Sequence, residues 1–418
     1  MTRRVAAALP TDLDDARIAA GRGEVRASFL QLAERFVPAE ARGVDVTYVV
    51  DLEGHTPTTI QVAGGRCLLS PGEPPHHDAR LHTDPATWLD IVAGRVDGIR
   101  AFTTGRLQVR GDLQHAVQLE TMFTTGPEAT RTTRTRTTRV RGTEIASWVS
   151  GAGTPVVLIH GLAASKVTFV PTLDDLADDH HVHAIDLPGF GRSGKPLPVG
   201  RRYTAAWFAD RVVEYLDAHG LADAYLVGNS MGGRIATEVA LAHPGRVRGV
   251  VGLGAAVAFD EWQLARPLLR LLRWQWAGGV PVRIPPSVLH RGIREMFHDP
   301  SRVPAENIRA AVDEAQNYLR DPGYRMAVVA ATRGLVTDPT YGRRGYWDRL
   351  VDLQVPSLWL YGRSDPLVSH RYGARVADTL PHAEVEVWDD LGHVPQFELP
   401  ERTHARIRRF LGTVEAGR

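Results

Sequence analysis

The sequence predicts an α+β domain in the first third of the chain and a larger α/β domain in the rest, with a mostly parallel sheet and helices on both faces. Three observations support this. Apolar and polar residues alternate through positions 44–69, which is typical of half-buried strands. Short, wholly apolar runs such as 156–159 and 224–227 recur later and indicate strands buried on both faces. From about 257 to 350 the strand pattern stops, and helical spacing predicts a cap inserted into the sheet.

The composition is that of an ordinary globular chain. Its 418 residues suit two domains, and 43% are apolar and 23% charged. The net charge of +1 gives no overall attraction to nucleic acid or anionic membranes. The single cysteine, Cys67, excludes an internal disulfide and is expected to be a small buried apolar residue. Five apolar residues before Pro10 are too few for a secretory signal, and no apolar run reaches membrane-spanning length. We expect a cytoplasmic protein with no integral membrane segment and no nucleic-acid partner.

The first third contains helix and strand signals but no catalytic set of residues. Helical spacing over Ala27–Phe36 predicts an opening helix, and the strands that follow are expected to form an antiparallel sheet. Asp84 begins a second helix that Gly94 ends, and the turn at Gly111 leads into a last helix. No cysteine or carboxylate stands at metal-ligand spacing from the local histidines, so we expect no metal site. These histidines are predicted to be solvated loop residues: His76, His77 and His82.

A family resemblance becomes specific in this first third. The segments 79–94, 101–102 and 105–113 resemble the sterol carrier protein 2 family, and the likeness covers about residues 20–125. The resemblance implies a lipid-binding domain over 1–125, with a curved five-stranded sheet, backing helices and an apolar tunnel for sterols, fatty acids or acyl-coenzyme A. The alternative is a docking or dimerisation module whose core is filled by its own large side chains: Trp88, Phe102, Leu119 and Phe123.

A linker is predicted at 126–136. Residues 131–139 are all arginine or threonine, but no aromatic residue is interleaved for base stacking, which argues against a nucleic-acid site. We interpret the segment as a solvated linker that enters an edge strand. Positive charges on such a strand discourage pairing with other edges.

The residues around Ser230 read Gly-Asn-Ser-Met-Gly, after an apolar strand and before a stretch with helical spacing. A sharp turn from strand to helix places a serine in a strained conformation at the top of a sheet. Such a turn leaves no room for side chains two residues before and two residues after the serine. Both of these positions, Gly228 and Gly232, are glycine.

Three further strand ends carry polar motifs in the order expected for a serine nucleophile, its acid and its base. The strand at 156–159 ends in His160-Gly161-Leu162, where backbone N–H groups can face an oxyanion. A later strand opens into a loop with Asp365, and the last strand leads to His393. The rival acid position, after the strand 250–253, has no carboxylate.

The segment 137–418 resembles the α/β-hydrolase superfamily in these motifs and in Asp-Leu-Pro-Gly-Phe-Gly-Arg-Ser at 186–193. The resemblance implies a cofactor-independent mechanism in which Ser230 attacks a carbonyl carbon, His393 transfers the proton and Asp365 orients the imidazole. The remaining implied site residues hold the oxyanion or support the turns. The oxyanion donors are Leu162 and Met231, and the supporting residues are His160, Gly161, Gly228 and Gly232.

The leading functional hypothesis is an esterase or lipase-like serine hydrolase that acts on a hydrophobic or lipid-like ester. Bulky apolar residues between Trp262 and Trp276 suit a cap over an acyl site, and their interleaved arginines also allow peripheral membrane contact. One alternative is a carbon–carbon bond hydrolase of ring-cleavage diketones. In those enzymes the sharp turn that carries the serine, called the nucleophile elbow, often has the sequence Gly-Asn-Ser-Met-Gly-Gly, as in this chain. Those enzymes usually place tryptophan after the histidine, where this chain has Val394. The other alternative is a non-catalytic lipid-binding protein. No residue pattern sets the oligomeric state.

Overall fold

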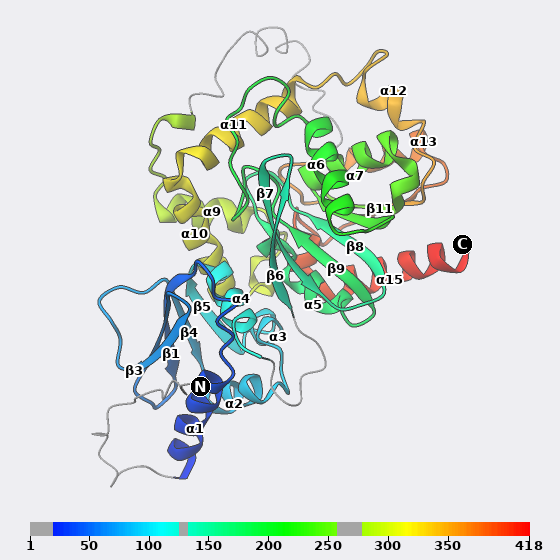
Figure 1. Ribbon diagram of the computed structural model, residues 1–418. Helices are drawn as coiled ribbons and strands as arrows, with labels where there is room; N and C mark the ends of the chain where they lie inside the picture. The colour runs from blue at the N-terminus through cyan, green and yellow to red at the C-terminus, as the bar shows by residue number, and fades with distance from the viewer. Residues whose placement is uncertain (1–19, 125–132, 257–277) are drawn as a thin grey trace. The chain divides into compact units, whose positions relative to one another are not determined.

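The computed structural model describes residues 20–124, 133–256 and 278–418 (Figure 1). The chain forms two compact units, one of residues up to Arg134 together with 304–314, and one of 135–303 together with 315–418. The strand β6 begins at Arg134, inside the range 126–136 predicted as linker. Most of that range lies outside the described residues.

The first unit contains a five-stranded sheet in the order β3-β2-β1-β4-β5. The strand number agrees with the family resemblance, but the sheet is mixed where an antiparallel one was predicted. β1 pairs with β4 in parallel because the chain crosses from β3 past β2 and β1 before β4 begins. The strands are β1 (Asp45–Leu52), β2 (Thr58–Ala63), β3 (Arg66–Pro71), β4 (Ala79–Thr83) and β5 (Leu107–Gly111).

Between residues 20 and 124 the described helices beside this sheet are α1 (Ala20–Glu34), α2 (Pro85–Ala93), α3 (Gly98–Thr103) and α4 (Leu113–Thr121). Asp84 caps α2 by accepting a hydrogen bond from the Thr87 N–H, and Gly94 ends the helix with φ of 85°. Trp88 stacks on Phe29 with ring centroids 4.8 Å apart, so aromatic side chains fill part of this core.

The parallel pairing of β1 and β4 also corrects the prediction for His82. This residue lies in β4, opposite Asp51 in β1, and its Nδ1 is 3.1 Å from Asp51 Oδ2. His76 and His77 are exposed, as predicted. Among the described residues no group of histidine, cysteine, aspartate or glutamate side chains is arranged to hold a metal.

Cys67 lies in β3 and is half-buried, less enclosed than predicted. Burial raises the pKa of its thiol to about 11, which keeps the sulfur protonated and unreactive near neutral pH.

The second unit is built on an eight-stranded sheet in the order β13-β12-β11-β10-β8-β9-β7-β6. The pairs from β9 through β13 are parallel, and β7 pairs antiparallel with β9. β6 is an edge strand, as predicted, and exposes its arginines. The strands are β6 (Arg134–Val140), β7 (Thr143–Ser150), β8 (Thr154–Ile159), β9 (His180–Ile185), β10 (Ala224–Asn229), β11 (Val247–Leu253), β12 (Ser357–Gly362) and β13 (Glu384–Trp388).

Helices connect the parallel strands, and a short 3₁₀ helix, η2 (Lys166–Phe169), follows β8. The helices between and after the strands are α5 (Val170–Leu176), α6 (Ala205–Ala218), α7 (Met231–Ala242), α13 (Arg371–Thr379), α14 (Pro395–Glu398) and α15 (Pro400–Ala416). All side chains of β10 and β12 are buried, as expected for parallel strands covered on both faces.

A helical insertion follows β11, the sixth strand of this sheet in chain order, as predicted for the cap. Its described helices are α9 (Pro286–Glu295), α10 (Ala305–Arg320), α11 (Pro322–Thr337) and α12 (Tyr346–Leu350). The apolar stretch from Trp262 to Trp276, interpreted as part of a cap, lies outside the described residues. In the described part of the chain no helix is both long and apolar enough to cross a bilayer.

Candidate active site

Ser230 lies in the tight turn between β10 and α7. Its backbone has φ of 55° and ψ of −118°, a strained conformation for a residue with a side chain. A Cβ atom on Gly228 would lie 2.2 Å from the carbonyl carbon of Gly232, and one on Gly232 would lie 1.9 Å from the carbonyl oxygen of Ile159. Both glycines are therefore required by close backbone packing, as the sequence predicted. The turn holds a half-buried serine at the carboxyl end of the central strand.

His393 and Asp365 meet in the loops after β13 and β12. The Nδ1 atom of His393 lies 2.7 Å from Oδ2 of Asp365. The other carboxylate oxygen accepts hydrogen bonds from the N–H groups of Leu367 at 2.8 Å and Val368 at 2.9 Å. The Asp365 carboxylate is fully shielded from solvent, so these contacts fix its orientation toward the imidazole.

The turn with Ser230 is joined to the turn with His393 through Asn229. The side-chain amide of Asn229 donates to the carbonyl oxygens of Leu253 at 2.9 Å and His393 at 3.0 Å. Among the described residues the Ser230 hydroxyl makes no hydrogen bond to the His393 imidazole. Such bonds are often long in enzymes without substrate and tighten when substrate binds.

Gly254 occupies the alternative acid position after β11. A Cβ atom there would lie 3.2 Å from Asp365 Oδ2 and 3.4 Å from His393 Nδ1, and the backbone has φ of +52°. A larger residue would press on the pair that the structure forms between Asp365 and His393. The position therefore makes room for an acid from the next strand.

His160 is buried and uses both ring nitrogens in the turn after β8. Its Nε2 accepts a hydrogen bond from the Leu187 N–H at 3.0 Å, which requires the proton to sit on Nδ1, where it donates to the Gly161 carbonyl at 2.7 Å. Burial lowers the pKa of His160, against an opposing effect of Asp186, and this favours the neutral ring. With both nitrogens occupied, His160 is suited to holding the turn and unsuited to proton transfer.

The turn after β8 also passes close to the serine. A Cβ atom on Gly161 would lie 3.1 Å from Cβ of Ser230, so the backbone passes directly over the nucleophile. Met231 is the first residue of α7, where an N–H group has no acceptor within the helix. In the described chain the N–H of Leu162 donates to no backbone carbonyl. Among the described residues, neither N–H group is therefore taken up by a backbone carbonyl.

Lys166 and Asp186 form a buried ion pair that the sequence did not reveal. Lys166 is 1% exposed and Asp186 0%, with Nζ and Oδ2 2.5 Å apart. The backbone N–H of Lys166 also donates to Oδ1 at 2.7 Å. Burial alone would raise the pKa of Asp186, but the ammonium of Lys166 lowers it below the ordinary value. The pair ties η2, just after the predicted oxyanion turn, to the loop after β9.

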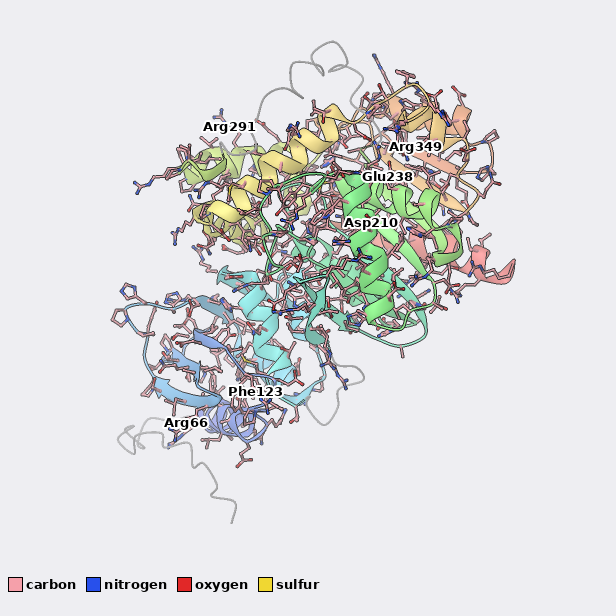
Figure 2. The ribbon with its side chains drawn as sticks, turned by 45° about the horizontal axis from the view of Figure 1, so that its top comes forward. Arg66, Phe123, Asp210, Glu238, Arg291 and Arg349 are labelled. Carbon is pink, nitrogen blue, oxygen red and sulfur yellow. The ribbon has the colours of Figure 1, made fainter. Side chains whose placement is uncertain are left out.

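A second buried charge network supports α7 one turn after the serine. Arg234 donates to Glu238 at 2.8 Å, and Arg349 of α12 donates to the same carboxylate at 2.7 Å. Figure 2 labels Glu238 and Arg349. Burial would raise the pKa of Glu238, but the two arginines lower it to about 2. The guanidinium of Arg234 also lies 3.9 Å from the ring centre of Tyr346. The network fixes the helix that follows the nucleophile.

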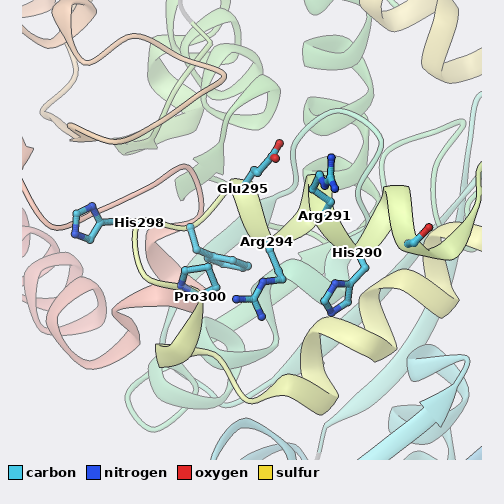
Figure 3. A pocket seen from close by; sticks show the side chains of 8 residues that line it. His290, Arg291, Arg294, Glu295, His298 and Pro300 are labelled. Carbon is cyan, nitrogen blue, oxygen red and sulfur yellow. The ribbon is translucent and has the colours of Figure 1, made fainter.

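A shallow hollow of about 600 Å³ lies on α9 and the turn after it (Figure 3). Its basic side chains do not converge, because Arg294 points to one side, as His290 does, and Arg291 points to the other. Ser230 is not among its lining residues, which are Ser287, His290, Arg291, Arg294, Glu295, Phe297, His298 and Pro300. The hollow therefore does not include the nucleophile.

Comparison with known proteins assigns each of the two parts of the chain to a family. The alpha/beta hydrolase fold family matches residues 154–400, and the SCP-2 sterol transfer family matches residues 29–124. Pimeloyl-[acyl-carrier protein] methyl ester esterase of Aeromonas salmonicida is 27% identical over 267 residues, which cover 63% of this chain and 97% of that protein. The 2-hydroxy-6-oxononadienedioate/2-hydroxy-6-oxononatrienedioate hydrolase of Paraburkholderia phymatum is 29% identical over 273 residues, 63% of this chain and 89% of the other.

The structural comparison agrees. A thermophilic esterase from Thermogutta terrifontis is 26% identical with a TM-score of 0.52, and the match covers 68% of this chain and 99% of that one. The predicted fold class and both family resemblances are confirmed. The chain belongs to the alpha/beta hydrolase fold family and carries an SCP-2 sterol transfer domain ahead of its hydrolase domain.

Proposed function

We propose that this protein is a serine hydrolase that cleaves carboxylic esters of hydrophobic or lipid-like substrates through an acyl-enzyme. The observation that carries the proposal is the buried contact of 2.7 Å between His393 and Asp365, joined through Asn229 to the strained turn of Ser230. A serine hydroxyl is a weak nucleophile until a base accepts its proton. The Asp365 carboxylate fixes the imidazole with Nε2 available for that purpose.

In the first half-reaction the Ser230 Oγ attacks the ester carbonyl carbon while Nε2 of His393 takes the hydroxyl proton. The carbonyl oxygen becomes negative, and the N–H groups of Leu162 and Met231 stabilise it. As the carbon–oxygen bond to the alcohol breaks, the imidazolium returns the proton to the departing oxygen. In the second half a water molecule attacks the acyl-enzyme with His393 again as base, which releases the carboxylic acid and restores Ser230.

The proposed substrate class is supported by the domain ahead of the hydrolase and by the relatives. The SCP-2 sterol transfer match suggests that the first domain binds a hydrophobic or lipid-like ligand. Two of the three relatives described above are named esterases. A carrier domain tethered to a hydrolase raises the effective concentration of a poorly soluble substrate to about the millimolar range, where geometry permits transfer.

Hydrolysis of p-nitrophenyl esters of increasing acyl length tests the proposal. We expect activity in the intact protein and a loss of at least about a thousandfold in Ser230→Ala. Ser70→Ala, which removes an exposed hydroxyl from β3, is the matched control and should keep full activity. Equal rates in the intact protein and in Ser230→Ala would reject the proposal.

A second candidate is the carbon–carbon bond hydrolase activity of the relative from Paraburkholderia phymatum. The Gly-Asn-Ser-Met-Gly-Gly sequence at the elbow favours it, and Val394 in place of the usual tryptophan argues against it. Cleavage of a vinylogous diketone ring-fission product faster than any ester would select this activity. The non-catalytic lipid-binding alternative predicts neither reaction.

A further inference from the structure

The backbone on both sides of the His393 side chain is held by hydrogen bonds. The N–H of Gly392 donates to Oε2 of Glu398 at 2.8 Å, and the N–H of His393 donates to the carbonyl of Met296 at 2.7 Å. The carbonyl of His393 accepts from Asn229. These three partners belong to three different parts of the chain, and together they set the direction in which the imidazole leaves the backbone.

Glu398, the last residue of α14, provides the buried part of this support. Its carboxylate is fully shielded from solvent, and its second oxygen, Oε1, accepts the N–H of Asp299 at 2.7 Å. One carboxylate therefore joins the turn of His393 to the segment that follows α9. A buried carboxylate is costly unless it is hydrogen-bonded, and two backbone donors satisfy both of its oxygens.

The segment 296–299 contacts the loops of both the base and the acid. A Cβ atom on Gly392 would lie 2.3 Å from the Met296 carbonyl oxygen, so only glycine permits this approach. The Nδ1 atom of His298 lies 2.7 Å from Oγ of Ser364, the residue before Asp365. Arg302, just beyond the segment, donates to the carbonyl of Asp390 at 2.7 Å.

We propose that Glu398 is a positioning residue for His393. Its two oxygens clamp the 296–299 segment against the base-bearing turn and thereby hold the imidazole where it can approach the Ser230 hydroxyl when substrate binds. The inference rests on the proposed function, because it assigns His393 the task of activating Ser230. Among the described residues, Glu398 hydrogen-bonds the N–H groups of Gly392 and Asp299 and does not hydrogen-bond the imidazole of His393 or the hydroxyl of Ser230.

Glu398→Gln tests the clamp with little change in side-chain volume. An amide offers one acceptor oxygen, so its NH₂ group must face either the Gly392 or the Asp299 N–H, and one of the two bonds is lost. We expect kcat for a short p-nitrophenyl ester to fall by about tenfold to a hundredfold, since a displacement near 1 Å costs about a hundredfold, with KM changed less than about twofold. The rate of Ser230 labelling by a fluorophosphonate probe should fall by the same factor.

The matched control is Glu401→Gln, an exposed carboxylate three residues later in α15, which should leave kcat and the labelling rate unchanged. Where Glu398→Gln does not fold, Arg302→Gln removes the neighbouring surface contact and should slow labelling by about threefold. Normal labelling in folded Glu398→Gln, or in Arg302→Gln where that variant replaces it, would overturn the positioning inference. Absence of labelling in the unmodified protein would instead reject the proposed function.

Discussion

The hydroxyl of Tyr324 in α11 donates a hydrogen bond of 2.7 Å to the carbonyl of Ala163. Ala163 directly follows Leu162, whose N–H we propose as an oxyanion donor, and its φ of 57° is unfavourable for a residue with a side chain. Such a conformation persists only when surrounding contacts hold it. The inserted helix α11 therefore stabilises the backbone turn that faces Ser230.

Tyr324→Phe should weaken oxyanion stabilisation without disturbing substrate binding. We expect kcat to fall by about threefold to thirtyfold, since loss of a whole oxyanion donor costs about 10²–10³ and this change only loosens one. The free energy of unfolding should fall by about 1 kcal/mol. Tyr361→Phe is the control, because the buried Tyr361 hydroxyl has no hydrogen-bond partner among the described residues. Equal kcat values in Tyr324→Phe and the unmodified protein would contradict this role.

Lys166→Met should destabilise the hydrolase domain strongly. The substitution keeps an unbranched side chain of similar length but leaves the carboxylate of Asp186 buried without its cation. Breaking one partner of a buried pair costs about 3–5 kcal/mol, whereas replacing both partners often costs less. Urea unfolding of Lys166→Met and of the double variant Lys166→Met, Asp186→Asn measures the free-energy cost of losing one partner and of replacing both. A single variant as stable as the unmodified protein, or a double variant clearly less stable than the single, would count against the pair.

Three neighbouring histidines should make the protein sensitive to acid. His183 in β9 is 1% exposed, and its ring centre lies 4.4 Å from that of His181 and 5.2 Å from that of His219. Burial, followed by repulsion from the other two imidazoles, lowers the pKa of His183 to about 3. The unfolded chain takes up this proton near its ordinary pKa of about 6.5 and the folded chain does not, so stability falls as pH drops from about 6.5 toward 3.

Replacing His183 should reduce that dependence. In His183→Asn the slope of unfolding free energy against pH between about 6 and 4 should fall by up to about 1.4 kcal/mol per pH unit, one proton's worth. His382→Asn is the control, because its imidazole is exposed to water in the folded chain as well. Chemical denaturation at a series of pH values gives the slopes. An unchanged slope in His183→Asn would show that protonation of His183 does not cause the loss of stability at low pH.

Gly232→Ala should abolish stable folding of the elbow. Its Cβ atom would lie 1.9 Å from the Ile159 carbonyl oxygen and 2.7 Å from the carbonyl carbon, and both are backbone atoms of a central strand. Overpacking typically costs about 1–3 kcal/mol, and this contact should exceed that range because no flexible side chain can move away. Gly245→Ala, whose Cβ would meet nothing within 4 Å, should change stability by less than about 0.5 kcal/mol. A similar melting temperature for both variants would contradict the packing argument.

The sequence was most informative where short-range patterns decide the structure. The elbow of Ser230 is a local motif whose glycines respond to contacts within one turn, and the structure gives it the predicted shape. Apolar runs located the strands, and parallel strands gather their carboxyl ends at one edge, so the loops of Asp365 and His393 were expected to meet. The contact between their side chains agrees with that expectation.

What the sequence could not show are pairings between distant residues without a motif. Lys166 and Asp186 are brought together by neighbouring strands, and Glu398 meets Asp299 only through the inserted segment. The parallel pairing of β1 with β4 was missed for the same reason, and the contact of His82 with Asp51 was missed with it. Alternation reveals which face of a strand is buried but does not reveal its partner or direction.

Labelling with a fluorophosphonate probe, followed by peptide mass spectrometry, tests the central claim most directly. The account predicts one phosphonate per chain, on the peptide that contains Ser230, with no adduct in Ser230→Ala and labelling slowed at least about a hundredfold in His393→Gln. A chain that does not react, or that reacts as readily after Ser230→Ala, would contradict the account.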